Sequence, residues 1–78
     1  MVTILFFGST ASVTGKREIT LDPPRSSKAK KVFDDVIAEY PQLASYRLLF
    51  SINQQYATGD EIVRDGDEFA IFTAVSGG

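Results

Sequence analysis

The residues best suited to a chemical role stand at the C-terminal end of the sequence. The 78 residues end in Gly77 and Gly78, which follow Val75 and Ser76. Two glycines can pass through a narrow channel and let the backbone of another protein approach closely. They also leave the terminal carbonyl unhindered for nucleophilic attack. We therefore expect Gly78 to carry the reacting group and Gly77 to give access to it.

A terminal carboxylate reacts only after it has been activated. Conversion to a mixed anhydride with AMP would need ATP and Mg²⁺ in a separate enzyme, because this sequence has no motif like a phosphate-binding loop. The activated acyl group can then pass to sulfur or to nitrogen. The sequence contains no cysteine and no histidine, which excludes a disulfide scaffold, a zinc finger, a thiol nucleophile and an imidazole base. We expect this chain to bind no cofactor, and any sulfur it carries must come from elsewhere.

Length and composition predict one small domain with a tail. With 78 residues, 44% of them hydrophobic, the chain can build a single core. The net charge of −2 argues against a nucleic-acid-binding protein. The N-terminus lacks the basic region of a secretory signal, and its apolar run at 4–7 is too short to span a bilayer, so we expect a cytosolic protein without a membrane partner. We expect residues 1–72 to form the domain and residues 73–78 a flexible tail.

The first half of the sequence predicts two strands and then a helix. Residues 2–7 form an apolar run with the length of a central strand, and residues 17–21 alternate apolar and polar side chains. Segment 8–15 between them is predicted to be a loop. The helix would begin at an N-cap on Ser26 or Ser27, and its apolar stripe has helical spacing: Ala29, Val32, Phe33, Val36, Ile37 and Tyr40. A basic run near the start of the helix is interpreted as a solvated face, or alternatively as a docking surface for an acidic partner: Arg25, Lys28, Lys30 and Lys31. Two i,i+4 pairs are expected on the helix: Lys30 with Asp34, and Lys31 with Asp35.

The second half predicts three more strands. Residues 48–52 and 68–73 alternate as long strands do, and residues 56–57 can form a short edge strand after a turn at 53–55. The acidic residues of this half do not match the spacing of a calcium-binding EF-hand, so we interpret them as turn residues: Asp60, Glu61, Asp65, Asp67 and Glu68. The order β-β-α-β-β(short)-β indicates an α+β protein of the β-grasp type. It is expected to have a mixed, twisted sheet of four or five strands on one helix, with the first and last strands parallel at the centre.

One face of this sheet has no predicted cover. Strand alternation directs ten apolar residues toward the helix: Val2, Ile4, Phe6, Ile19, Leu21, Leu48, Phe50, Ile52, Phe69 and Ile71. Four apolar residues point away from it: Leu5, Phe7, Leu49 and Phe72. A contiguous apolar patch on a small protein usually marks a binding site. The alternative is that the loop at 8–15 covers these side chains. If the patch is a binding site, a Phe72→Asp substitution should keep the fold and abolish partner binding.

The sequence also resembles the small subunit of molybdopterin synthase, the MoaD type among the ubiquitin-like sulfur carriers. The likeness covers essentially the whole chain, and its most specific part is the C-terminal one. It rests on the following segments: Ile4-Leu5-Phe6-Phe7, Val13-Thr14-Gly15, Ile52-Asn53-Gln54, and Gly66-Asp67-Glu68 through Phe72 to Val75-Ser76-Gly77-Gly78.

The resemblance implies a reaction for Gly78. An adenylyltransferase related to ubiquitin-activating enzymes would activate it, and the adenylate would be converted to a thiocarboxylate. The tail would then enter the large subunit of molybdopterin synthase and deliver its sulfur to a cyclic pterin monophosphate, a step of molybdenum cofactor biosynthesis. This chain would be a subunit without catalytic activity of its own. Partner contacts would come from Leu5, Phe7, Leu49, Phe72, Val75 and Ser76, and from Tyr56, which stands where the family typically has an aliphatic residue. Thr73-Ala74 stand where the family often has two prolines.

Three other functions share this fold, so the fold cannot decide among them. The protein could be a modifier that joins the Gly78 carboxyl to lysine amines, a sulfur carrier for another pathway such as the thiamine pathway, or a β-grasp binding module with an inert tail. Deletion of Gly78 should abolish every function except the last one.

Overall fold

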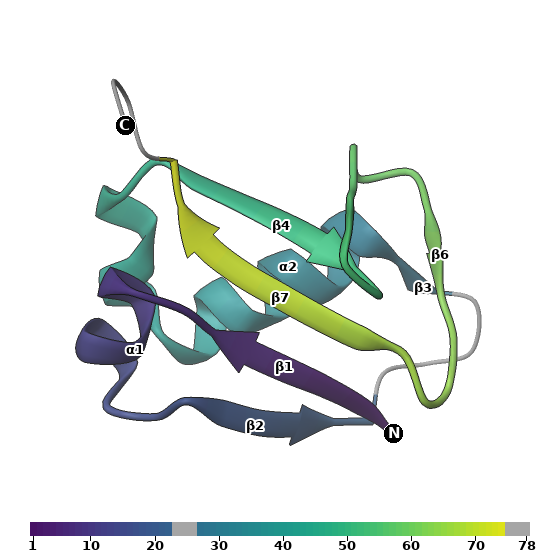
Figure 1. Cartoon of the computed structure of the whole chain (residues 1–78), viewed down its shortest axis with the longest axis horizontal. Coiled ribbons are helices and arrows are strands. Elements are labelled where there is room, and N and C mark those ends of the chain that lie inside the picture. The colour runs from purple at the N-terminus through teal and green to yellow at the C-terminus, as the bar shows by residue number, and fades with distance from the viewer. Residues whose placement is uncertain (23–26, 75–78) are drawn as a thin grey trace.

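The protein is a mixed β-sheet packed on one long helix, with shorter elements at its two ends (Figure 1). The computed structural model describes residues 1–22 and 27–74. In chain order its elements are β1 (Val2–Phe6), α1 (Ser9–Thr14), β2 (Glu18–Leu21), β3 (Ser27–Lys28), α2 (Ala29–Glu39), the 3₁₀ helix η1 (Pro41–Ser45), β4 (Leu48–Ile52), β5 (Gln55–Tyr56), β6 (Ile62–Val63) and β7 (Glu68–Thr73).

The main sheet has the order β2-β1-β7-β4-β5. Strands β1 and β7 are parallel neighbours, with Ile4 opposite Phe69, and the other pairs in this sheet are antiparallel. Figure 1 shows these two arrows side by side with α2 behind them. The β-grasp prediction, including the central parallel pair, is confirmed.

The core lies between the inner face of the sheet and the apolar stripe of α2. Val32 and Val36 of the helix are fully buried, as are Ile4 and Phe69 of the central strands. All ten residues predicted to face the helix lie in this core or pack against it. Strand alternation was a sound guide here because one face of every long strand is covered by the same helix.

Helix α2 begins at Ala29 without a side-chain cap. The N–H groups of Ala29 and Lys30 instead donate to the carbonyls of Glu61 (2.7 Å) and Gly59 (3.0 Å). The predicted N-cap at Ser27 is wrong, because the backbone of that residue pairs with Val63 in the small β3–β6 sheet. The other candidate, Ser26, lies outside the described residues.

The predicted loop at 8–15 contains the helix α1, so this part of the prediction is wrong. Serine and threonine have modest helix propensity, and six residues are too few to show a clear apolar stripe. Gly15 ends the helix in the left-handed conformation (φ 74°), and its N–H donates to the carbonyl of Ala11. Within the described residues, no helix is long and apolar enough to cross a membrane.

Candidate functional site

The face of the sheet opposite α2 carries an apolar surface, which we call the outer patch: Leu5, Phe7, Leu49, Tyr56 and Phe72. Register places these side chains together, because Leu49 pairs with Phe72 across β4 and β7, and Phe7 directly follows β1. Phe7 is 51% exposed, Leu49 42% and Tyr56 77%, whereas Leu5 and Phe72 are half-buried.

The outer patch is packed as well as exposed. The rings of Tyr56 and Phe72 meet edge to face, with their centroids 5.8 Å apart. Ser51 and Ala70 lie between the larger side chains in the register of the same face and are almost fully buried. The patch therefore has a firm floor, which favours a well-defined docking surface over a set of loose side chains.

Segment 8–15 does not cover the outer patch. Helix α1 packs at the end of the sheet, near β7 and η1, and leaves Phe7 exposed. In Figure 1, no helix lies in front of the sheet within the described residues. The alternative in which this segment hides the apolar side chains is therefore wrong, because α1 folds against the sheet end and not across its face.

The strand that leads to the C-terminal tail is held in the sheet beyond Phe72. Thr73 pairs with Leu48, and the N–H of Ala74 donates to the carbonyl of Arg47 at 2.9 Å. The predicted reactive and tail residues, Val75, Ser76, Gly77 and Gly78, lie outside the described residues. The division into a domain and a flexible tail stays a prediction, but the last described residues of the chain lie directly beside the outer patch.

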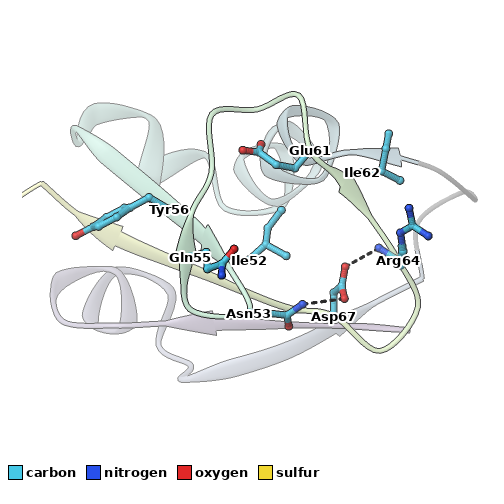
Figure 2. A pocket seen from close by; sticks show the side chains of 8 residues that line it. All are labelled: Ile52, Asn53, Gln55, Tyr56, Glu61, Ile62, Arg64 and Asp67. Carbon is cyan, nitrogen blue, oxygen red and sulfur yellow. Dashed lines mark hydrogen bonds between the residues drawn. The ribbon is translucent and has the colours of Figure 1, made fainter.

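A hollow of about 500 Å³ lies between the β4–β5 turn and β6 (Figure 2). Its carboxylates accept hydrogen bonds from groups of the protein itself. Asp67 accepts from the N–H of Arg64 (2.8 Å) and from the side-chain amide of Asn53 (3.0 Å). In Figure 2 the Asp67 side chain is directed at both donors.

Glu61 closes the neighbouring loop in the same way. Its carboxylate accepts from the N–H groups of Thr58 (2.7 Å) and Gly59 (2.8 Å). These hydrogen bonds stabilise the charged form and lower the pKa of Glu61 from 4.5 to about 2. For Glu61 and Asp67 the interpretation as turn residues is confirmed, and no cluster suited to a metal ion occurs in residues 1–22 and 27–74.

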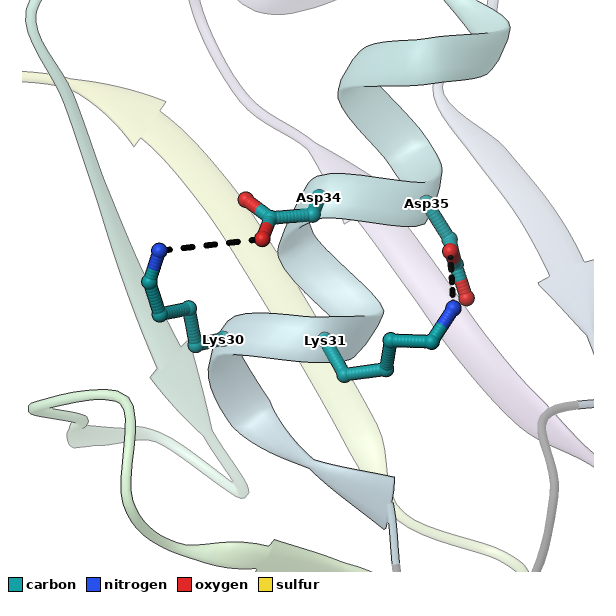
Figure 3. A network of polar contacts seen from close by, with 4 residues as sticks. All are labelled: Lys30, Lys31, Asp34 and Asp35. Carbon is teal, nitrogen blue, oxygen red and sulfur yellow. Dashed lines mark hydrogen bonds and ion pairs between the residues drawn. The ribbon is translucent and has the colours of Figure 1, made fainter.

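The adjacent carboxylates of α2 are also paired with their own helix (Figure 3). Lys30 lies 3.7 Å from Asp34, and Lys31 lies 2.6 Å from Asp35. Figure 3 shows the two pairs pointing to different sides of the helix. As exposed i,i+4 pairs, they contribute about 0.3–0.5 kcal/mol each to helix stability. They do not form an acid–base pair of the kind that catalysis requires.

Comparison with known proteins shows to which family the chain belongs. Residues 4–78 match the model of the ThiS family. The chain belongs to the ThiS family. The match begins within β1, extends over α2 and β7 and continues through the glycine pair, so it includes the residues of the outer patch and the predicted reactive residues.

Two relatives of this ThiS-family chain are named molybdopterin synthase sulfur carrier subunit. The human protein is 33% identical over 82 residues, which cover 99% of this chain and 93% of the human protein. The Arabidopsis thaliana protein is 32% identical over 79 residues, which cover 99% of this chain and 82% of that one. The likeness of the sequence to this group, first inferred from short segments, is therefore confirmed over nearly the whole chain.

Solved structures confirm the β-grasp fold of the ThiS-family chain. SAMP1 from Haloferax volcanii superposes with a TM-score of 0.86 at 25% identity, covering 99% of this chain and 98% of that one. A putative molybdopterin converting factor subunit 1 from Pyrococcus furiosus gives a TM-score of 0.87 at 17% identity, covering 95% of this chain and 97% of that one. At 17% identity, this second likeness shows the fold alone.

In this ThiS-family chain, the structure brings together all five described residues that were predicted to bind partners. They form the outer patch, and their partner-binding role stays a prediction. Sequence reasoning missed Arg47, whose carbonyl holds Ala74, and Thr10, whose side chain is fully buried beside Phe7. The contact of Arg47 with Ala74 could have been predicted by extending the antiparallel pairing of Leu48 with Thr73 by one residue. No sequence signal marks Thr10, because its burial depends on the packing of α1, and the sequence predicted a loop in place of this helix.

Proposed function

We propose that this protein is the sulfur-carrier subunit of a molybdopterin synthase and that Gly78 bears the reacting carboxyl. The observation that carries the proposal is the match to two proteins of that name, at 33% and 32% identity with 99% of this chain covered in each case. The exposed outer patch beside the base of the tail supports it, because a carrier must dock on other proteins to present its terminus.

The proposed reaction changes the Gly78 carboxylate first into an acyl adenylate and then into a thiocarboxylate. In an adenylyltransferase that binds ATP and Mg²⁺, a Gly78 carboxylate oxygen attacks the α-phosphorus of ATP, and pyrophosphate leaves. Hydrosulfide supplied by a sulfur donor then attacks the carbonyl carbon of the acyl adenylate, a carbon–sulfur bond forms, and AMP leaves, which yields a thiocarboxylate on Gly78. In the large subunit of the synthase, this sulfur is transferred to the cyclic pterin precursor. This chain supplies the acyl group and the docking surface, and its partners supply the catalytic residues.

The outer patch sets where these reactions can occur. Four residues follow Ala74, and an extended chain of that length spans at most about 14 Å. An active site that reaches Gly78 must therefore open close to the end of β7, next to Phe72. We propose that the adenylyltransferase and the large synthase subunit both bind the outer patch and thus engage it in turn. The cytosolic location stays a prediction.

Reconstitution with purified partners tests this proposal. The chain bearing a C-terminal thiocarboxylate, mixed with the large synthase subunit, should convert the cyclic pterin precursor to molybdopterin. The same chain with an ordinary carboxylate, and a chain lacking Gly78, should bind the large subunit through the outer patch but give no product. Absence of product from the thiocarboxylate form would refute the assigned function.

A second candidate function is that of a protein modifier. The likeness to SAMP1, a small archaeal modifier protein, favours it. In that case the activated Gly78 carbonyl would be attacked by a lysine amine to form an isopeptide bond. Mass spectrometry of tryptic peptides separates the two candidates. Lysines that carry the C-terminal glycines, with no thiocarboxylate found on Gly78, would establish the modifier and exclude the sulfur carrier.

A further inference from the structure

Thr10 has a fully buried side chain at the junction of β1, α1 and β7. Its hydroxyl donates to the carbonyl of Phe7 at 2.7 Å and lies 3.0 Å from the carbonyl of Ile71. The N–H of Thr10 also donates to the Phe7 carbonyl, and the N–H of Phe7 donates to the Ile71 carbonyl, at 3.2 and 3.1 Å. This one threonine therefore ties the residue that follows β1 to the last strand of the sheet.

The residue held in this way is one of the most exposed members of the outer patch. Phe7 stands where the chain leaves the sheet, since Gly8 follows with a positive φ of 59°. A large ring with half of its surface in solvent has few side-chain neighbours to restrain it. Its position therefore depends on how firmly its own backbone is held, and Thr10 provides two of the contacts that hold it.

The same hydroxyl also reaches the strand that carries the other aromatic anchor. Ile71 directly precedes Phe72, and β7 ends at Thr73, at the base of the tail. The Thr10 hydroxyl therefore holds the backbone of Phe7 beside the residue that precedes Phe72. The register and strand alternation assign both residues to the outer patch, on the face of the sheet opposite α2.

We propose that Thr10 is a positioning residue for partner docking. Its hydroxyl keeps Phe7 in place against β7, so the two phenylalanine rings meet the partner in a preformed arrangement. A surface that is already ordered loses less conformational freedom on binding, and the complex dissociates more slowly. This inference rests on the proposed function, because the docking partner is the large subunit of the synthase.

Two substitutions separate this role from ordinary stabilisation. Thr10→Val removes the hydroxyl with little change in shape, and neither carbonyl then lacks a donor, since the N–H groups of Thr10 and Phe7 remain. Thr14→Val is the matched control in the same helix. The hydroxyl of Thr14 donates to the carbonyl of Thr10 at 2.9 Å and lies 3.0 Å from the carbonyl of Lys16, so it contacts neither the carbonyl of Phe7 nor that of Ile71.

The experiment measures the kinetics of binding between the full chain and the immobilised large subunit. Thr10→Val should dissociate about tenfold faster than the wild type with an unchanged association rate. Thr10→Ser, which keeps the hydroxyl, and Thr14→Val should both dissociate at nearly the wild-type rate. In a Phe7→Ala background, Thr10→Val should add no further loss, because the ring that it positions is gone.

Three results would overturn the inference. The first is that Thr10→Val dissociates at the wild-type rate. The second is that Thr10→Ser or Thr14→Val dissociates as fast as Thr10→Val. The third is that Thr10→Val speeds dissociation as much in the Phe7→Ala background as in the wild type. A measurement on the wild type alone gives a further test that does not depend on the folding of any variant. Nitrogen-15 relaxation should find the backbone N–H of Phe7 as ordered as those of β1, and a freely mobile backbone at Phe7 would refute the inference. If the wild type fails to bind the large subunit, the proposed function fails, and the inference fails with it.

Discussion

Phe7 exposes half of its surface and lies outside the core, but it belongs to the outer patch, where it and Phe72 follow the paired residues Phe6 and Ile71. Side chains of this kind often carry much of the binding energy of an interface, because the partner removes their remaining exposed surface from water. We predict that Phe7→Ser weakens binding to the large subunit by about 30-fold, which corresponds to about 2 kcal/mol. The free energy of unfolding should change by less than about 0.5 kcal/mol.

Isothermal titration calorimetry and urea denaturation measure these two quantities. The matched control is Ile62→Ser, because Ile62 is also an exposed apolar residue (39%) but lies on β6, outside the outer patch. This control should bind as the wild type does. Equal loss of affinity in the two variants would show that the outer patch has no special role in docking.

Glu61 makes stability depend on pH through its hydrogen bonds to Thr58 and Gly59. The folded state lowers its pKa from 4.5 to about 2. Its contribution to the free energy of unfolding is therefore fully present above about pH 4.5 and is lost as the pH falls through about 2. The stability difference between the wild type and Glu61→Gln should be largest above pH 4.5 and should shrink toward pH 2. Urea denaturation at a series of pH values measures it, and a difference that does not vary with pH would contradict this account.

Among the elements, the β4–β5 hairpin has a turn whose second central residue, Gln54, is of a type that does not favour its conformation. Asn53 and Gln54 both have positive φ, 50° and 70°, as the two central residues of a type I′ turn do. Asparagine accepts this conformation readily, whereas glutamine is strained in it. We predict that Gln54→Gly raises the free energy of unfolding by about 0.5–1 kcal/mol. Chemical denaturation tests this, with Gln55→Gly in β5 as the control that should destabilise; a loss of stability in Gln54→Gly would contradict the prediction.

Helix α1 depends on a glycine at its end. Gly15 has a φ of 74°, and no atom beyond its immediate chain neighbours lies within 4 Å of the place where a β-carbon would stand. The penalty of Gly15→Ala is therefore conformational and not steric, and we predict a loss of about 1 kcal/mol in unfolding free energy. Ser12→Ala, an exposed change inside the same helix, should cause no loss. Equal stability of Gly15→Ala and the wild type in chemical denaturation would refute the prediction.

The long elements were predictable from the sequence and the short ones were not. Strands β1, β4 and β7 and helix α2 repeat their apolar pattern over several residues, and their boundaries were predicted to within a few residues. Strands β3 and β6 have two residues each, which is too few to show any period. Their pairing and the capping of α2 by the loop carbonyls are tertiary contacts between distant segments, so they leave no local sequence signal.

At the scale of the whole molecule, the outer patch could be predicted because it follows from counting layers. One long helix packed on the main sheet buries only one face of that sheet, so apolar residues on the other face remain available. The sequence showed which residues these are, including Phe7 and Leu49. It did not show the packing of Tyr56 on Phe72 or the contact of Thr10 with Phe7, because both depend on how the edge strand and α1 fold against the sheet.

For the molecule as a whole, we propose a docking surface, the outer patch, joined to a reactive terminus. The central part of this proposal is that Gly78 reacts. Intact-mass spectrometry tests this claim most directly, after incubation with ATP, Mg²⁺, a partner adenylyltransferase and a sulfur donor. We predict that one oxygen at Gly78 is replaced by sulfur and that a chain lacking this residue is unchanged. An unchanged mass for the wild-type chain, or sulfur found at any other position, would contradict it.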